Sequence, residues 1–203
     1  MSVDDGQRLI PDALGLHNRL VQEHLARYHF AGDYVRGRVL DLACGVGYGS
    51  QYLASRPGVA EVIGIDHCPA TIQYARRRYP HGLVEYHVAD ALDTHLPERF
   101  GLFDTICSFE TIEHLSADKL FLRILRSMLA PGGLLIISTP FGRGRGQPCA
   151  DPYHVWQYRP EEFRELLAEV FPAVTLYYQL GSQIELPRGN KRYFLGVALC
   201  RGG

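Results

Sequence analysis

The sequence predicts an α/β fold, in which apolar strands alternate with helices along most of the chain. One observation is an apolar run at residues 39–43, followed by a glycine-rich turn and a helix pattern. Another is the repetition of strand and helix patterns as far as residue 138, and a third is a pair of strand-like runs near the end of the chain. Strands that alternate with helices form parallel sheets covered by helices. We therefore expect a mostly parallel sheet between two helical layers.

Length and composition indicate a single globular unit. The chain has 203 residues, of which 46% are hydrophobic and 21% charged, and its formal net charge is −1. We predict an N-terminal helical cap over residues 1–34 and one globular domain over residues 35–203. The near-neutral charge argues against a nucleic-acid partner, because a large nucleic-acid footprint needs a basic surface.

The cysteines and the apolar runs of the sequence indicate in which cellular compartment the protein is expected. The five cysteines include no pair at C-x-x-C spacing, which suggests neither a disulfide framework nor a zinc site. The N-terminus has no basic-then-apolar signal segment, and no run approaches the roughly 20 apolar residues of a membrane span. We therefore expect a cytoplasmic protein that does not associate with membranes.

The glycine-rich turn after the first strand predicts a nucleotide site. Gly45, Gly47 and Gly49 let the backbone turn sharply and let a ligand lie against it. Strand, turn and helix together form the first half of a nucleotide-binding βαβ unit. Asp41 lies just before the turn, where its carboxylate would repel a pyrophosphate. It suits a ligand that carries an ammonium and a sulfonium, and S-adenosylmethionine (SAM) carries both.

The remaining elements follow in order. A cap helix is expected over residues 17–30, and the second strand, residues 60–66, ends in Asp66. An acid at that point accepts hydrogen bonds from ribose hydroxyls in nucleotide-binding α/β folds. The other predicted elements are a helix at 69–79, a strand at 83–88, a strand at 102–109, a helix at 116–128 with Ser116 as its N-cap, a strand at 134–138, a helix at 160–170, and strands at 174–178 and 193–200. Residues 141–157 are rich in glycine and proline and predict a mobile loop over the site.

Acids and histidines gather after the fourth strand. Glu110, Glu113 and His114 stand at i, i+3 and i+4, so a helix here would project all three from one side. His154, in the long loop, can close over the same spot. Two carboxylates and two imidazoles suit Mg²⁺, Mn²⁺ or Fe²⁺. Alternatively His114 or His154 is a catalytic base without a metal, or the cluster only packs the junction between strand and helix.

Five stretches in order resemble the motifs of class I SAM-dependent methyltransferases. They are VLDLACGVGYGS (39–50), VIGID (62–66), VADAL (88–92), FDTICSFETIEHL (103–115) and LRSMLAPGGLLIISTP (125–140). The resemblance covers nearly the whole chain and implies a Rossmann-like three-layer sandwich, with a seven-stranded sheet whose last strand is antiparallel. Residues 8–11, 23–31, 151–155 and 160–163 resemble a bacterial subgroup often associated with polysaccharide or secondary-metabolite genes.

The same resemblance implies a set of SAM-binding residues. The glycines and Asp41 would line the methionine end, Asp66 would hold the ribose, and Asp90 with Ala91 would frame the adenine. Phe109 and Glu110 would lie beside the methionine, and Tyr28 with Arg27 would cover the cofactor from the cap. The full set is Tyr28, Asp41, Ala43, Gly45, Gly47, Asp66, His67, Asp90, Ala91, Phe109 and Glu110.

The leading hypothesis is methyl transfer from SAM to a hydroxyl of a small molecule, such as a sugar or secondary metabolite. A metal-dependent RNA 2′-O-methyltransferase is an alternative, because the Glu/His cluster is similar to the metal site of small-RNA methyltransferases, although the net charge argues against it. A SAM-binding regulatory protein without catalysis is another. An NAD-dependent oxidoreductase is disfavoured by the G-x-G-x-G spacing. Five aromatic side chains form either an acceptor wall or packing: Tyr153, Trp156, Tyr158, Tyr177 and Tyr178.

Overall fold

Alternating side chains along each strand bury both faces of one sheet. In β1 (Gly37–Leu42), Leu40 and Leu42 join a core cluster with two helices, whereas Val39 joins a second cluster on the other face. This pattern has the period of two that a strand requires. The computed structural model describes residues 10–15, 17–149, 151–189 and 191–202.

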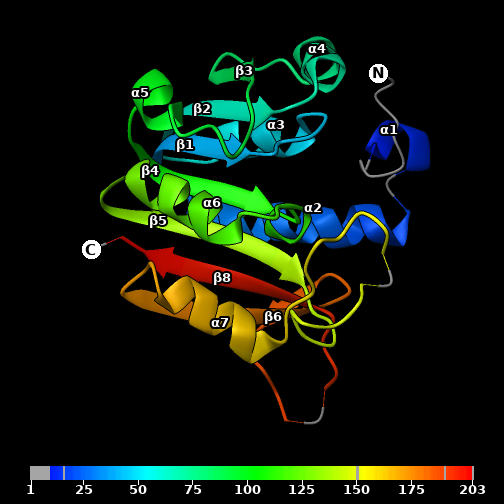
Figure 1. Cartoon of the computed structure of the whole chain (residues 1–203). Coiled ribbons are helices and arrows are strands. Elements are labelled where there is room, and N and C mark those ends of the chain that lie inside the picture. Colours follow the sequence, from blue (N-terminus) through cyan, green and yellow to red (C-terminus); the bar gives the residue numbers. More distant parts are fainter. Residues whose placement is uncertain (1–9, 16, 150, 190, 203) are drawn as a thin grey trace.

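The sheet has eight strands in the order β3-β2-β1-β4-β5-β8-β6-β7 (Figure 1). The first five strands pair in parallel, and β8 is antiparallel to both β5 and β6. The other strand bounds are β2 (Val59–Asp66), β3 (Val84–Val88), β4 (Phe103–Phe109), β5 (Leu129–Pro140), β6 (Ala173–Leu180), β7 (Gln183–Glu185) and β8 (Leu195–Arg201). The predicted α/β sandwich is confirmed, with one strand more than the seven expected. The extra strand, β7, has three residues, too few for a recognisable pattern.

Helices cover both faces of this sheet. In Figure 1, α6 (Asp118–Ser127) and α7 (Pro160–Ala168) lie in front of it and α2 (Arg19–Gly32) lies behind, with α3 (Tyr48–Ala54) on the same side as α2. The remaining helices are α1 (Pro11–Leu14), α4 (Pro69–Arg78), α5 (Leu96–Phe100) and the short 3₁₀ helix η1 (Ile112–His114). Within the described residues, no helix is both long and apolar enough to cross a membrane. The cytoplasmic location stays a prediction.

Several element boundaries differ from those predicted, among them the starts of α6 and β5. The N-cap of α6 is Ala117 rather than Ser116, because η1 and the extended Leu115 delay the start of the helix. Strand β5 begins at Leu129, and residues 130–133 fall in a register irregularity against β4. Residues 1–9 and 16 of the predicted cap, including two positions of the 8–11 stretch, lie outside the described residues.

Candidate functional site

The turn between β1 and α3 is built from backbone conformations that favour glycine. Gly45 and Gly47 have φ of 54° and 93°, and Ala43 has a φ of 64°. Gly49 is constrained differently, because a Cβ there would lie 1.9 Å from the ring of Tyr28. The turn therefore packs directly under the cap helix α2, and a side chain at position 49 has no room.

Asp41 places a carboxylate beneath this turn. Its side chain is buried and accepts hydrogen bonds from the Ser50 hydroxyl at 2.6 Å and the Tyr28 hydroxyl at 3.2 Å. Burial raises the pKa of Asp41 to about 6, against the lowering effect of these two bonds. At neutral pH the group is mostly ionised and suits a cationic ligand. Ser50 was not singled out from the sequence, although it belongs to the same motif.

Asp66 ties the end of β2 to the glycine turn. Its Oδ2 accepts from the Gly45 backbone N–H at 3.2 Å, and its Oδ1 accepts from that of Cys68 at 2.9 Å. His67 beside it is exposed, and its Nδ1 lies 3.7 Å from Asp66 Oδ1. Two backbone donors thus fix the orientation of a buried carboxylate at the carboxyl edge of the sheet, where α/β folds bind ligands.

Asp90 and Ala91 follow β3 at the same edge. Asp90 is exposed, and its Oδ1 accepts from the backbone N–H of Leu92 at 2.9 Å, which makes a local turn. Ala91 packs against the core cluster that contains Leu42 and Ile65. The predicted adenine residues and the predicted ribose residue therefore stand at the ends of two paired strands, β3 and β2.

Arg27 and Glu110 form an ion pair at the end of β4. Arg27 is buried, and its Nη2 lies 3.1 Å from Glu110 Oε2. Glu110 follows Phe109, whose ring contacts Tyr28 edge-on at 5.0 Å. Glu110 has a φ of 49° and precedes η1, so the helical spacing expected for Glu110, Glu113 and His114 is not formed. The carboxylate of Glu110 pairs with Arg27 of the cap and does not belong to the group of Glu113, His114 and His154.

Glu113, His114 and His154 do come together. One potential ligand atom from each lies within 4.8 Å of the other two. Glu113 is fully buried, and its Oε2 accepts from the Thr139 hydroxyl at 3.0 Å. Its Oε1 has no hydrogen-bond partner among the described residues. Burial raises the pKa of Glu113 to about 8, so this carboxyl is largely protonated at neutral pH.

The two histidine rings meet edge-on, with centroids 4.8 Å apart. His114 Nδ1 lies 3.0 Å from the carbonyl oxygen of Tyr153. Because a carbonyl only accepts, Nδ1 carries a hydrogen, and Nε2 is the acceptor nitrogen of the neutral tautomer. Burial lowers the pKa of His154, which favours the neutral imidazole. The pair is able to accept a proton.

Residues 141–149 and 151–158, here called the strap, cross the carboxyl ends of β4 and β5 (yellow in Figure 1). The backbone N–H groups of Val155 and Trp156 both donate to the Glu113 carbonyl, at 2.9 and 3.0 Å. Farther along, Arg145 and the Tyr158 hydroxyl bind the buried carboxylate of Asp118, at 2.9 and 3.0 Å. These contacts hold the strap to η1 and α6, which the prediction of a mobile loop did not anticipate.

Four of the five candidate wall aromatics are used in packing. Tyr158 is buried and Trp156 lies under the Arg145 guanidinium at 4.1 Å. Tyr177 packs on Phe30, and Tyr178 packs between Phe141 and Tyr193. Tyr153, which is 46% exposed, stands beside His114 and His154. Of the five, it alone remains a candidate for contact with an acceptor.

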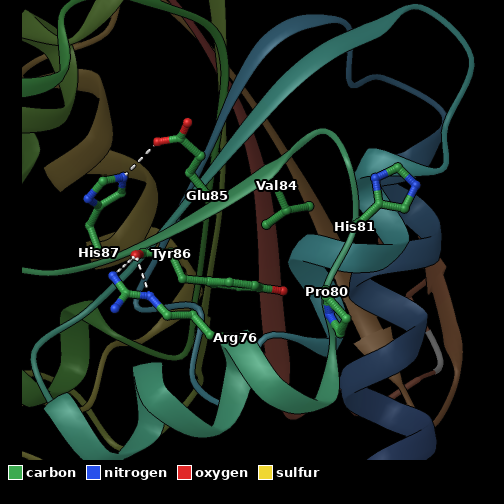
Figure 2. A pocket seen from close by; sticks show the side chains of 7 residues that line it. All are labelled: Arg76, Pro80, His81, Val84, Glu85, Tyr86 and His87. Atoms are coloured by element: carbon green, nitrogen blue, oxygen red, sulfur yellow. Dashed lines mark hydrogen bonds and ion pairs between the residues drawn. The ribbon is translucent and has the colours of Figure 1, made fainter.

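Two hollows lie away from these residues. Figure 2 shows one of about 300 Å³ against β3 and α4, where the Arg76 guanidinium donates to the Tyr86 carbonyl and His87 faces Glu85. The other, of about 630 Å³, lies between α2 and the turn from β6 to β7. None of the predicted site residues lines either hollow, so we assign no role to them.

Comparison with known proteins identifies related sequences. Residues 40–137 match the family described as methyltransferase domain. A protein named as a probable S-adenosylmethionine-dependent methyltransferase of Mycolicibacterium smegmatis is 33% identical over 167 residues, 80% of this chain and 62% of that protein. Ubiquinone biosynthesis O-methyltransferase of Azorhizobium caulinodans is 33% identical over 102 residues, 50% of this chain and 40% of that protein. Phosphoethanolamine N-methyltransferase 1 of Arabidopsis thaliana is 38% identical over 117 residues, 56% of this chain and 23% of that protein.

The chain therefore spans less than two thirds of the length of these relatives, which include both O- and N-methyltransferases. Solved structures share the fold at lower identity. A complex of DhpI with S-adenosylhomocysteine (SAH) has a TM-score of 0.67 at 19% identity and covers 94% of this chain and 89% of that one. The methyltransferase domain of bacterial CtHen1 has a TM-score of 0.68 at 18% identity and covers 91% of this chain and 100% of that one.

Proposed function

Because the family match, the relatives and the structural neighbours support a class I SAM-dependent methyltransferase, we propose that this chain transfers a methyl group from SAM to a hydroxyl of a small-molecule acceptor. The observation that carries the hydroxyl assignment is the pair of His114 and His154. A hydroxyl must lose its proton during methylation, and His114 Nε2 is held ready to accept one. Sugars and secondary metabolites are the acceptor classes we favour.

The charges at the carboxyl edge of the sheet support SAM as the donor. Asp41 offers one negative charge to the sulfonium and ammonium end, and Asp66 offers two oxygens held toward a ribose. Arg27 supports recognition of the methionine carboxylate. Its Nε–H is buried and has no partner within the described part of the chain, although Nη1 and Nη2 are both bound. A carboxylate oxygen would satisfy this donor.

The chemical step needs alignment more than activation. The acceptor oxygen forms a bond to the methyl carbon while the bond from that carbon to sulfur breaks, and the sulfonium leaves as a neutral thioether. The hydroxyl proton passes to an imidazole of the histidine pair. Holding the two reactants in line and excluding water supplies much of the rate. The strap, fixed across the carboxyl ends of β4 and β5, supports that exclusion.

A divalent cation is a second candidate at the same cluster. The unpartnered Glu113 Oε1 favours it, because a cation would satisfy a buried oxygen that has no hydrogen-bond partner among the described residues. Glu113, His114 and His154 would hold the ion, and Glu110 is engaged by Arg27 instead. Bound there, a cation would lower the pKa of the acceptor hydroxyl. This arrangement keeps RNA 2′-hydroxyls among the acceptors worth testing.

The test is a transfer assay with SAM that carries a labelled methyl group. The acceptors are hydroxylated aromatic acids, monosaccharides, phosphoethanolamine as an amine, and a short RNA duplex. We expect transfer to a small-molecule hydroxyl, and a rate about 10²- to 10⁴-fold lower for His114→Ala or His154→Ala. His95→Ala removes an exposed histidine that precedes α5 and pairs with Glu98, so it serves as the matched control and should leave the rate unchanged.

The other possible results of this assay each favour a different function or contradict the proposed one. Activity lost with EDTA and restored by Mg²⁺ or Mn²⁺ supports the cation, and unchanged activity removes it. Transfer only to the amine or only to RNA contradicts the small hydroxyl acceptor. Binding of SAM without transfer to any acceptor supports a regulatory protein.

A further inference from the structure

A buried amide from the C-terminal part of the chain contacts the cap helix. Gln179, in β6, is 3% exposed. Its Nε2 donates to the carbonyl oxygens of Glu23 and Gly181 at 2.8 and 2.7 Å, and its Oε1 accepts from Arg27 Nη1 at 3.0 Å. Only one orientation of the amide satisfies these partners, because two carbonyls face one end and a guanidinium faces the other.

Gln179 determines how the Arg27 guanidinium lies. The group is planar, so two anchored nitrogens fix its plane and with it the direction of the Nε–H bond. Gln179 anchors Nη1, and Glu110 anchors Nη2 at 3.1 Å. Glu110 is partly exposed and lies on a turn, whereas Gln179 is buried in a strand paired on both sides. Gln179 is therefore the more rigid of the two anchors.

This guanidinium lies at one end of the cofactor site. Tyr28, the next residue on α2, donates to Asp41, and Glu110 directly follows Phe109. Asp66, Asp90 and Ala91, expected at the ribose and adenine, follow other strands. We propose that Gln179 is a positioning residue that holds Arg27 for the amino-acid part of SAM and has no part in recognising its adenosine. This inference rests on the proposed function.

Both members of the pair lie outside the matched residues 40–137. Arg27 comes from the cap and Gln179 from a strand that reaches the sheet through the antiparallel β8. The C-terminal strands therefore complete a cofactor site whose other parts come from residues 27–110.

The experiment compares two ligands by calorimetric titration of the full chain. SAM has the amino-acid part, and 5′-methylthioadenosine has the adenosine and a thioether but lacks it. Gln179→Met, which has similar length and no hydrogen bonds, should weaken SAM binding about 10-fold, since it removes one hydrogen bond to a charged group. Its affinity for 5′-methylthioadenosine should stay within about twofold of the wild-type value.

A double-mutant cycle tests whether Gln179 acts through Arg27. Arg27→Lys keeps the charge but cannot reach both anchors. Adding Gln179→Met to this variant should change its SAM affinity by less than about twofold. Gln179→Glu keeps an oxygen toward Arg27 but sets its other oxygen against the carbonyls of Glu23 and Gly181, so it is expected to restore the SAM affinity only in part. It also serves if Gln179→Met does not fold. Gln183→Met, an exposed amide in β7, is the matched control.

Several results would overturn the proposal. They are unchanged SAM affinity in a folded Gln179→Met, an equal loss for both ligands, or fully additive losses in the double variant. Wild-type protein that binds 5′-methylthioadenosine but not SAM also contradicts it. Wild-type protein that binds neither ligand refutes the proposed function itself, which separates the two failures.

Discussion

The two ends of the site are held together by different means. At the cofactor end, the Asp66 carboxylate is fixed by backbone N–H groups, and Asp41 is fixed by hydroxyls, one of them from the neighbouring α3. At the strap end, Glu113, His114 and His154 are joined by contacts between segments about 40 residues apart along the chain. Burial raises the pKa of Asp41 only to about 6, so one end carries an ionised carboxylate at neutral pH, whereas at the other end burial raises the pKa of Glu113 to about 8 and lowers the pKa of His154.

This difference indicates which property of the protein a substitution should change at each end of the site. At the proposed cofactor end, the residues that would hold the ligand also hold the turn, so changes there should alter folding and SAM binding together. At the strap end, none of the predicted SAM-binding residues belongs to the cluster of Glu113, His114 and His154, so changes there should alter the rate or acceptor binding and leave SAM binding unchanged. The following predictions test that separation, from the largest expected effect to the smallest.

The largest effect on stability is expected from Gly49→Ala. A Cβ at this position would lie 1.9 Å from the Tyr28 ring, so α2 or α3 must shift. We expect a loss of about 3 kcal/mol of unfolding free energy. Thermal denaturation should then show a midpoint roughly 6–12 °C lower. Gly82→Ala, where a Cβ meets nothing within 4 Å, is the control. Equal midpoints for the two variants would show that α2 does not pack on the turn.

The pH dependence of SAM binding should report on Asp41. Its pKa of about 6 in the folded protein lies above the value in an unfolded chain. Protonation therefore stabilises the folded protein at low pH, and this contribution is lost as the pH rises through about 6. The cationic ligand prefers the ionised form, so SAM affinity should rise up to about tenfold between about pH 5 and pH 7.

Calorimetry at several pH values tests this rise, with Asp41→Asn as the comparison. The amide cannot ionise, so its SAM affinity should be weak and nearly independent of pH over the same range. A wild-type affinity that does not change, or a variant that follows the wild type, would assign the titration to another group.

The smallest effect is expected from Tyr153→Ala. Its exposed ring is the candidate for stacking against an acceptor, and its loss should raise the acceptor KM about two- to tenfold. The dissociation constant of SAM should not change, because Tyr153 lies at the strap end. Phe194→Ala, which removes a ring that is 52% exposed elsewhere, should alter neither quantity. A Tyr153→Ala variant that weakens SAM binding would break the separation between the two ends.

The place in the fold of the proposed cofactor residues could be predicted from sequence, because they lie in or just after strands with strong apolar patterns. The positions of Asp66 and Asp90 at the carboxyl edge followed from the order of those strands. The pairing of Glu110 with Arg27 could not, because it depends on a left-handed turn at Glu110 and on a cap helix far away in the sequence. The contact of Gln179 with α2 could not be predicted for a similar reason, since nothing in the sequence around Gln179 indicates it.

The strap shows the same limit. Its glycines and prolines indicate a loop, but its ties are backbone N–H groups on the Glu113 carbonyl and an arginine on a buried aspartate. Such partners leave no periodic signal. The meeting of His114 with His154 was anticipated only because both residue types suit the expected chemistry.

The most direct test of the account is a calorimetric titration of the purified chain with SAM, with Asp66→Ala as the comparison. We predict roughly micromolar binding to the wild type. The variant should bind at least about tenfold more weakly, because it loses the carboxylate that we propose binds the ribose. Thermal denaturation of both proteins establishes that each is folded. A folded wild type that does not bind SAM, or a variant that binds it equally well, would contradict the cofactor site described for this edge of the sheet.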